Sequence, residues 1–448
     1  MMLRTPILAA LLSVSTCAAF AQQPEARAPR PITLREAVDL ALAHSHAVRL
    51  AHLSVEEKDQ GKAVAKSAYF PQIRNETRVA HLTDTQLIAI PAGGFGVIGG
   101  TPVPPQTLTL NQGGVNAALN GTSVVQPLTS LFKAKAGNDI ARAEAEATRD
   151  RAHSIEDNTA LRVHQLYYRI LIADVRRRAA LARVTAADDL QRERVQQVRY
   201  GSALEPDLIE SRARSLTAKQ DLLTTEVEMS DLHMQFNDLI GLPMTTAFVL
   251  DPNVSMSPER YDQDASVKAA LDVHPDIAEA RAQVEKAAAA VRLARYEFIP
   301  DVEAFGGYSF QSNLPFLAGH YGTVGIRASY DLFEGGKRRS VIREREAELA
   351  QAKENLARIS DEVELRVQMA YNKLERTRQM IAVSEELVAL RRESHRITTE
   401  QLAEGAALIS QTAESNSQEL EARAALLQSQ LDYLQAADEM NDAIGRRP

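Results

Sequence analysis

The sequence predicts a mainly helical protein in which one structural unit occurs twice, with a small strand portion that forms part of a membrane β-barrel. Three observations predict this class. The chain matches itself at a constant offset, very long segments carry helical periodicity, and short segments of alternating polarity lie between the helices. Each unit reads in the same order, as a helix, a pair of strands, a very long helix and a return helix.

The first residues have the features of a secretory signal peptide. Arg4 precedes an apolar run from Ile7 to Val14, and Ala19-Phe20-Ala21 forms a small-residue cleavage site. We expect residues 1–21 to be removed on export. A short membrane anchor and lipidation of Cys17, the only cysteine, are the alternatives. No later segment has the ~20 apolar residues of a transmembrane helix, so we expect any membrane span to be built from strands.

The composition argues against nucleic-acid binding and against catalysis. The formal net charge is −8 and no basic block occurs, whereas a nucleic-acid surface needs clustered Lys and Arg. We find no Ser-His-Asp set, phosphate loop or clustered zinc ligands, and His44 and His46 lie two residues apart, where helical side chains diverge. We expect a protein that is not an enzyme and holds no cofactor and no metal.

Two similar hexapeptides reveal the internal repeat. FNDLIG ends at Gly241 and MNDAIG ends at Gly445, which gives an offset of 445 − 241 = 204 residues. From Leu128 onward this match needs no gap. Upstream, residues 69–73 resemble 298–302 at an offset of 302 − 73 = 229, and the difference, 229 − 204 = 25, is an enlarged Gly- and Pro-rich loop at about 84–113 in the first unit. Matched residues of the first unit include Leu161, Arg162, Val163, Tyr167, Gly201, Leu204, Ser211, Asn237 and Asp238.

These offsets divide the chain into a first repeat over residues 22–243, a linker over 244–263 and a second repeat over 264–448. Long helices are expected at about 131–240 and 337–445. A helix of ~65 residues spans roughly 100 Å, so its apolar row must lie against other long helices. The shared Asn-Asp ending is expected to cap or to be solvated, before a glycine that ends each helix. The coiled-coil-like row of the second repeat is Leu349, Ala352, Leu356, Ile359, Val363, Val367, Ala370 and Leu374.

Alternating polarity predicts two strands per repeat, at about 72–83 and 114–128 and at about 301–312 and 321–333. Strands of ~10 residues with an apolar and a polar face match a barrel with lipid outside and water inside, although a soluble sandwich fits the alternation equally well. In the first repeat the apolar parity is opposite at the 204 offset, so we expect a bulge or a one-residue shift there. Four strands cannot close a membrane barrel, and open edges in lipid cost several kcal/mol per unpaired group. The chain must therefore pool its strands with copies of itself.

The signal peptide, the paired repeat, the two strands per unit and the very long helices together resemble the TolC-like outer membrane factors over nearly the whole chain after residue 21. The resemblance implies a homotrimer with a twelve-stranded outer membrane β-barrel, four strands per chain, joined to a long α-helical barrel that extends into the periplasm. It implies a passive exit duct surrounded by outer membrane lipid, working with a periplasmic adaptor (membrane fusion) protein and an inner membrane transporter. Type I protein secretion is the alternative within the family, and a secreted coiled-coil structural protein is the alternative from another class.

The most specific motif of this family is the helix-hairpin tip, a glycine followed six residues later by Asp and a hydrophobic residue. It reads Gly201 to Leu208 in the first repeat and Gly405 to Thr412 in the second, where Gln411 replaces the Asp. The resemblance implies that these tips contact the adaptor and that nearby acidic side chains constrict the periplasmic entrance. The implied adaptor contacts are Gly201, Ser202, Ala203, Leu204, Gly405, Ala406, Ala407 and Leu408, and the implied constriction residues are Glu414, Gln411, Asp207 and Glu210.

Glu414 is the acidic residue at the second tip's constriction positions. In a trimer it would form a ring of three like charges, which attracts cations in a narrow pore; a solvated helix residue is the alternative interpretation. Gln411, and Ala407 at the position of a basic gating residue, depart from the family pattern and argue against a tight, ion-locked closed state. Neither the substrate, whether drug, metal or protein, nor the class of pump can be read from the chain.

Overall fold

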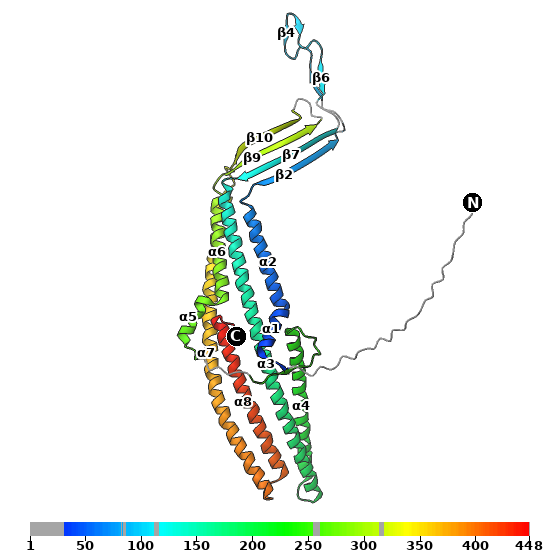
Figure 1. Ribbon diagram of the computed structural model, residues 1–448, viewed down its shortest axis with the longest axis vertical. Helices are drawn as coiled ribbons and strands as arrows, with labels where there is room; N and C mark the ends of the chain where they lie inside the picture. The colour runs from blue at the N-terminus through cyan, green and yellow to red at the C-terminus, as the bar shows by residue number, and fades with distance from the viewer. Residues whose placement is uncertain are drawn as a thin grey trace, which may run out of the picture.

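The computed structural model describes residues 31–81, 83, 87–111, 116–253, 260–312 and 318–447. The expected signal peptide, residues 1–21, lies outside the described residues. The chain is long and narrow, with a small sheet near one end and paired helices running to the other (Figure 1). Within the described part of the chain, no helix combines the length and the apolar character needed to cross a membrane.

The two repeats fold in the same order. A short helix and an upper helix lead into the strands, a very long helix runs from the sheet to the far tip, and a return helix ends at mid-length (Figure 1). The first repeat consists of β1 (Pro31–Ile32), α1 (Leu34–His44), α2 (His46–Ser67), β2 (Gln72–His81), β7 (Asn116–Pro127), α3 (Ser130–Arg199) and α4 (Glu205–Leu239), and the linker after it carries β8 (Val249–Leu250). The second consists of α5 (Gln263–Val273), α6 (Pro275–Tyr296), β9 (Asp301–Ser312), β10 (His320–Ser329), α7 (Lys337–Ala403) and α8 (Ile409–Ile444).

The enlarged segment of the first repeat is not simply a loop. It contains two short antiparallel pairs, stacked one beyond the other, that project past the end of the sheet (Figure 1). The outer pair is β4 (Val97–Ile98) with β5 (Thr101–Pro102), and the inner pair is β3 (Leu87–Ile90) with β6 (Leu108–Asn111). The Gly and Pro residues that predicted a loop lie mainly in the turns of these hairpins.

The main sheet has four antiparallel strands in the order β10-β9-β7-β2. Its two hairpins have the same register, because Gln72 pairs with Val125 and Asp301 pairs with Ser329, and these pairs are related by 301 − 72 = 229 and 329 − 125 = 204. The bulge or one-residue shift expected in the first repeat is therefore wrong. The described parts of β2 and β10 pair on one side only, so both edges of the sheet are open.

Hydrogen bonds between polar side chains explain how the first hairpin keeps this register despite its reversed polarity. Asn75 Nδ2 donates to Thr122 Oγ1 at 2.7 Å, and Asn120 Nδ2 donates to Thr77 Oγ1 at 2.6 Å. These four side chains lie on one face and satisfy one another across β2 and β7. Polar side chains on the face that was expected to be apolar thus form hydrogen bonds with one another across the two strands.

Charge is confined to one face of the sheet. The register places Arg74, Glu76, Arg78, Glu303 and Arg327 on a single face, whereas the described strand residues of the opposite face include no Asp, Glu, Lys or Arg. A hollow of about 350 Å³ on the charged face is lined by Arg74, Glu76, Arg78, Phe305 and Tyr321, among others. The charged face is therefore the concave one, as a water-filled lumen requires.

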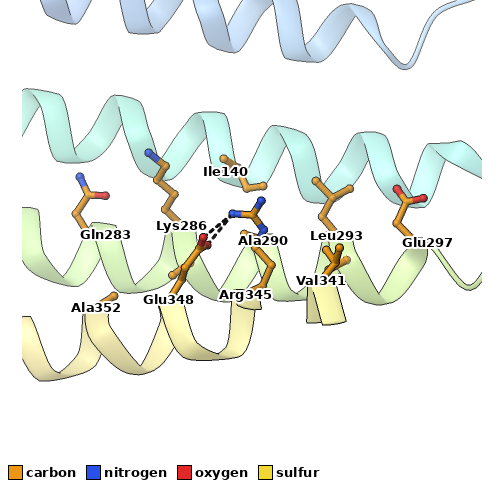
Figure 2. A pocket seen from close by; sticks show the side chains of 12 residues that line it. Ile140, Gln283, Lys286, Ala290, Leu293, Glu297, Val341, Arg345, Glu348 and Ala352 are labelled. Carbon is orange, nitrogen blue, oxygen red and sulfur yellow. Dashed lines mark hydrogen bonds and ion pairs between the residues drawn. The ribbon is translucent and has the colours of Figure 1, made fainter. Parts of the chain in front are cut away.

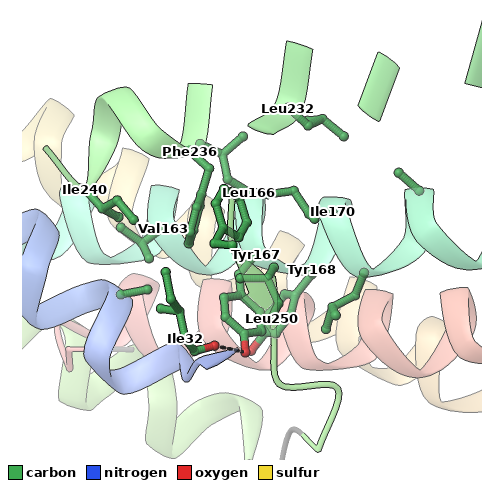
Figure 3. Packing of buried hydrophobic residues seen from close by; sticks show 14 of the residues in the cluster. Ile32, Val163, Leu166, Tyr167, Tyr168, Ile170, Leu232, Phe236, Ile240 and Leu250 are labelled. Carbon is green, nitrogen blue, oxygen red and sulfur yellow. Dashed lines mark hydrogen bonds between the residues drawn. The ribbon is translucent and has the colours of Figure 1, made fainter. Parts of the chain in front are cut away.

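A buried cluster at mid-length ties the start of the first repeat and the linker after it to the long helices. Tyr167 of α3 is fully buried against Phe236 and Leu232 of α4 (Figure 3). Its hydroxyl donates to the carbonyl oxygens of Ile32 at 3.0 Å and Asp251 at 2.8 Å. The Tyr167 side chain thus joins the parallel pair β1–β8 to the long helices. A second buried cluster, around Val363, Val367 and Met440, joins α7 and α8.

The repeated Asn-Asp-x-Ile-Gly ending packs the end of each return helix against the end of the short helix of its own repeat, and this contact is here termed the joint. Gly241 and Gly445 have φ of +74° and +83°, which favours glycine. A Cβ at Gly241 would collide with the His44 side chain, and a Cβ at Gly445 would lie 2.9 Å from the Cα of His274. Asn237 is not solvated: it is 1% exposed, and its Nδ2 donates to the carbonyls of Met244 and Thr246 at 3.1 and 3.0 Å.

Candidate entrance at the helix tips

Two tip turns of the same conformation lie at the end of the chain opposite the sheet (Figure 1). One joins α3 to α4 through residues 200–204, and the other joins α7 to α8 through residues 404–408. Gly201 and Gly405 have φ of +72° and +73°. Among the described residues, no atom lies within 4 Å of a Cβ built at either glycine. The positive φ alone therefore requires glycine at both tips.

Each return helix begins with a side-chain cap. The Leu204 N–H donates to Asp207 Oδ2 at 3.1 Å, and the Leu408 N–H donates to Gln411 Oε1 at 3.0 Å. These acceptors satisfy a backbone N–H at the start of a helix that would otherwise have no partner. The Asp of the tip motif thus has a structural role, and the Gln411 amide performs that role without the negative charge.

A groove of about 880 Å³ runs between the two helical hairpins just behind the tips. Its walls include Glu210 of α4 and Leu408, Gln411 and Glu414 at the start of α8. The structure therefore brings together three of the four predicted constriction residues. Asp207 is not among the described residues that line this groove. Neither are seven of the eight predicted adaptor-contact residues, namely Gly201, Ser202, Ala203, Leu204, Gly405, Ala406 and Ala407.

Glu210 and Glu414 differ in how their charge is compensated. Glu210 forms an ion pair with Arg214 one helical turn away, at 3.0 Å. Glu414 accepts a hydrogen bond from Gln418 Nε2 at 2.9 Å, and within the described residues it forms no ion pair. Both side chains are exposed. Glu414 therefore retains the negative charge that a cation-attracting ring needs, whereas the charge of Glu210 is largely balanced.

Contacts that the sequence did not predict hold the α7–α8 hairpin against α3. Arg183 of α3 lies 2.8 Å from Glu421 of α8 and 3.5 Å from Asp221 of α4, so it joins three helices behind the groove. Toward mid-length, Arg176 donates to Gln428 Oε1 at 2.8 Å. Nothing in the sequence links Arg183 to Glu421, because 421 − 183 = 238 residues separate them and charges are abundant on every helix.

The nearby Asp438 carboxylate of α8 is held by two side chains of α3. His164 Nδ1 lies 2.7 Å from its Oδ2, and the Tyr168 hydroxyl donates to the same oxygen at 2.9 Å. Burial and the Asp438 charge together raise the pKa of the Tyr168 hydroxyl, which therefore stays protonated and acts as a donor. This contact anchors the hairpin at the end farther from the tip.

Near the tip, the seam between α7 and α8 is polar. The buried aliphatic residues of α7 end at Leu374, and beyond them Ser384 Oγ lies 2.9 Å from Ser429 Oγ. Closer to the tip, Ser415 Oγ lies 3.0 Å from His395 Nδ1 and accepts a hydrogen bond from Thr398 Oγ1 at 2.8 Å. Because less apolar area is buried here, separating or sliding this half of the hairpin costs less than disturbing its mid-length half.

A charged cluster at mid-length surrounds the end of α8. Burial raises the pKa of Asp442 to about 6, against the opposing effect of nearby Arg366 and with a smaller contribution from the acidic Asp157, Asp276 and Glu439. Burial likewise lowers the pKa of His274. In the described part of the chain, no group of three or more His, Cys, Asp or Glu side chains is arranged to hold a metal ion.

A separate groove follows α3, α6 and α7 below the sheet (Figure 2). It has a volume of about 570 Å³, and its apolar lining includes Ile140, Leu293 and Val341. Arg345 forms an ion pair with Glu348 along its edge. Alternating apolar and paired charged side chains are typical of a helix–helix seam.

Comparisons with known proteins show what the chain and its fold resemble. Residues 267–446 match the family described as outer membrane efflux protein. The outer membrane efflux protein BepC of Brucella suis biovar 1 is 23% identical over 369 residues, which cover 80% of this chain and 73% of BepC. The structure resembles the outer membrane protein VceC of Vibrio cholerae with a TM-score of 0.74 at 15% identity, covering 92% of this chain and 96% of VceC. It resembles the outer membrane channel CmeC of Campylobacter jejuni with the same TM-score and identity, covering 99% of this chain and 94% of CmeC. These likenesses confirm the predicted fold class.

Proposed function

We propose that this chain is a TolC-like outer membrane efflux protein and serves as the outer membrane exit duct of a tripartite efflux system. The match of residues 267–446 to the outer membrane efflux protein family and the fold that the chain shares with outer membrane channels support this proposal. The duct conducts substrates passively to the exterior. Its helices extend into the periplasm, where an adaptor protein and an inner membrane transporter deliver the substrate.

The observation that carries this proposal is the sheet. Its edge strands β2 and β10 are open, its charged side chains lie on the concave face, and its other face carries no Asp, Glu, Lys or Arg among the described strand residues. Such a sheet is stable in lipid when the edges pair with those of identical neighbours. Three copies give a twelve-stranded barrel with a charged lumen and an uncharged outer surface. No covalent chemistry is needed for this function.

The residue roles at the tips are part of the same proposal. Glu414 forms the constriction ring, with Gln411, Glu210 and Asp207 around it, and the eight tip residues 201–204 and 405–408 meet the adaptor. The exposed, uncompensated carboxylate of Glu414 and its place in the groove between the hairpins support this assignment. Residues 1–21 are the export signal, and the repeats over 22–243 and 264–448 are the two halves of the duct.

The proposal is tested by expressing the chain in an outer membrane and fractionating it. We expect it to resist salt washing, to need detergent for extraction, to migrate as a trimer, and to form ion-conducting channels in planar bilayers. A salt-extractable, non-conducting protein would instead support a secreted coiled-coil structural protein.

A deletion strain separates efflux from the alternative of type I protein secretion. Greater sensitivity to drugs or metals, restored by the wild-type gene, supports efflux. Unchanged sensitivity together with the loss of a secreted protein supports type I secretion.

A further inference from the structure

The enlarged segment of the first repeat stands out for its charge and its exposure. Between Asp84 and Lys133 the sequence has no Asp, Glu, Lys, Arg or His over 132 − 85 + 1 = 48 residues, in a chain that is 25% charged. The part from residue 87 to 111, here termed the insert hairpin, exposes Phe95 at 70% and Ile98 at 72%, with Val97 between them. These three side chains at the end of the hairpin are here termed its tip patch; Val97 and Ile98 are consecutive residues of β4 and point to opposite faces of the hairpin. An exposed apolar patch of this kind marks an interaction surface.

The insert hairpin has a defined shape. The inner pair β3–β6 and the outer pair β4–β5 form backbone ladders. Between them the Gly93 N–H donates to the Pro104 carbonyl at 2.9 Å, the Phe95 N–H donates to the Val103 carbonyl at 2.8 Å, and the Val103 N–H donates to the Gly96 carbonyl at 2.8 Å. The tip patch is therefore held in place before it meets a partner, which lowers the entropy cost of binding.

Its position decides which partners can reach it. The strands β2 and β7 join the long helices at Gln72 and Pro127, and the insert hairpin follows their opposite ends, at His81 and Asn116 (Figure 1). In the proposed duct, with the helices in the periplasm, the insert hairpin stands at the outer mouth of the barrel. In the second repeat only 319 − 313 + 1 = 7 residues separate β9 from β10, too few for a second hairpin of this length, so a trimer carries three insert hairpins.

We propose that the tip patches of the three chains pack against one another over the outer mouth and form an apolar cap. The inference rests on the proposed function, because it needs the trimer. On a three-fold axis every side chain meets its own copies, so any charge would meet two like charges. A segment without a single charge avoids that repulsion. An anionic lipid surface, by contrast, is recognised by Lys and Arg, which this segment lacks.

The reach of the insert hairpin is sufficient for such a cap. Twelve strands at ~4.8 Å spacing, tilted by about 35–45° as in closed barrels, give a ring with a radius of roughly 11–13 Å. A four-residue strand alone spans about 13 Å, and the insert hairpin extends beyond β3 by its outer pair. Tethering in one trimer also places the three patches at millimolar effective concentration, so a weak apolar contact suffices.

Cysteine cross-linking tests the cap directly. The only cysteine of the sequence is Cys17, within the expected signal peptide, so V97C introduces a single thiol into the exported chain. In the purified trimer we expect oxidation to cross-link two of every three chains. H320C is the matched control at the same end of the sheet, because equivalent positions on barrel strands lie a third of the ring apart, well beyond the ~4.4–6.8 Å that a disulfide needs between Cα atoms. Cross-linking of V97C no greater than that of H320C would overturn the proposal.

Two further measurements distinguish whether neighbouring chains or lipid cover the tip patch. V97D places three carboxylates on the axis and should raise single-channel conductance at least twofold, whereas V97A should leave it within experimental error; unchanged conductance in V97D speaks against a cap. Because the chain has no Trp, F95W is a unique fluorophore. Its emission should be insensitive to brominated lipid in vesicles, and strong quenching would show that lipid covers the patch instead. If the wild-type protein forms no trimer or channel, the proposed function itself fails; a conducting trimer without cross-links rejects the cap alone.

Discussion

Arg183 of α3 and Glu421 of α8 lie 2.8 Å apart and join the two helical hairpins behind the tips. The same guanidinium group lies 3.5 Å from Asp221 of α4. Any movement that separates α8 from α3 at the entrance must break this contact, whereas the polar seam between α7 and α8 offers less resistance. The Arg183–Glu421 pair is therefore a point at which the contact between the two hairpins of the proposed duct can be weakened selectively.

Arg183→Ala should increase the open population of the channel. The side chains of Arg183 and Glu421 are 49% and 37% exposed, so their pair is worth about 0.2–1 kcal/mol and the effect is at most about fivefold. Arg178→Ala is the control, because Arg178 pairs with Asp174 within α3 at 2.9 Å and, among the described residues, links no second helix. Open probability in planar bilayers measures the difference. Equal effects of the two substitutions would contradict a specific role for Arg183.

Substitutions at Gln411 should separate its capping role from the charge at the entrance. Gln411→Asp retains an acceptor for the Leu408 N–H and adds a carboxylate beside Glu414, so cation preference should rise while the tip stays ordered. Gln411→Ala removes the cap and should loosen the first turn of α8 by about 0.5–2 kcal/mol. Ion selectivity and hydrogen exchange over residues 405–412 report the two effects. Glu414→Gln should lower cation preference without changing the exchange.

Asp442 should make the stability of the mid-length cluster depend on pH. Its folded pKa of about 6 lies above the ordinary value of 3.8, so the folded state binds the extra proton and stability falls as the pH rises from about 4 to 6. At neutral pH the buried carboxylate costs at most about 3 kcal/mol. Asp442→Asn should therefore stabilise the protein near pH 7 and have little effect near pH 4. Thermal unfolding of both proteins across this range gives the difference, and a pH-independent difference would refute the assignment.

Gly241→Ala should destabilise the joint at the end of α4. The positive φ and the contact with His44 together should lower the free energy of unfolding by ~1–3 kcal/mol or more. Gly137→Ala is the opposite case, because Gly137 lies inside α3 and no described atom is within 4 Å of the position that an added methyl group would take. That substitution should stabilise the helix by about 0.5–1 kcal/mol. Melting temperatures that shift in the same direction would contradict this interpretation of the joint.

The sequence predicted what depends on periodicity and on the repeat. The long helices, the strand pairs and the tip turns follow from patterns that the two copies share, so Gly201 and Gly405 could be matched before their closely similar φ angles were known. The polarity pattern gave a wrong prediction where tertiary contacts determine the pairing of the strands. Asn120 and Thr122 suggested a shifted strand, but their hydrogen bonds to Thr77 and Asn75 are possible only after β2 and β7 have paired.

Pairings between distant residues could not be predicted. Arg183 has many possible acidic partners on the long helices, and only the packing of α8 against α3 selects Glu421. Asn237 similarly looked like an exposed cap, because the sequence does not show that the chain after α4 folds back to place two carbonyls beside its amide.

The two tips share one backbone but carry different caps, a carboxylate at Asp207 and an amide at Gln411. A trimer therefore presents a ring of six tip turns. The backbone of this ring has approximate sixfold symmetry, but its charges have only threefold symmetry. A partner ring of six identical subunits would contact the two kinds of turn alternately. Three subunits of that ring would bind turns with a charged cap and three would bind turns with a neutral cap, so identical subunits would be held with two different energies.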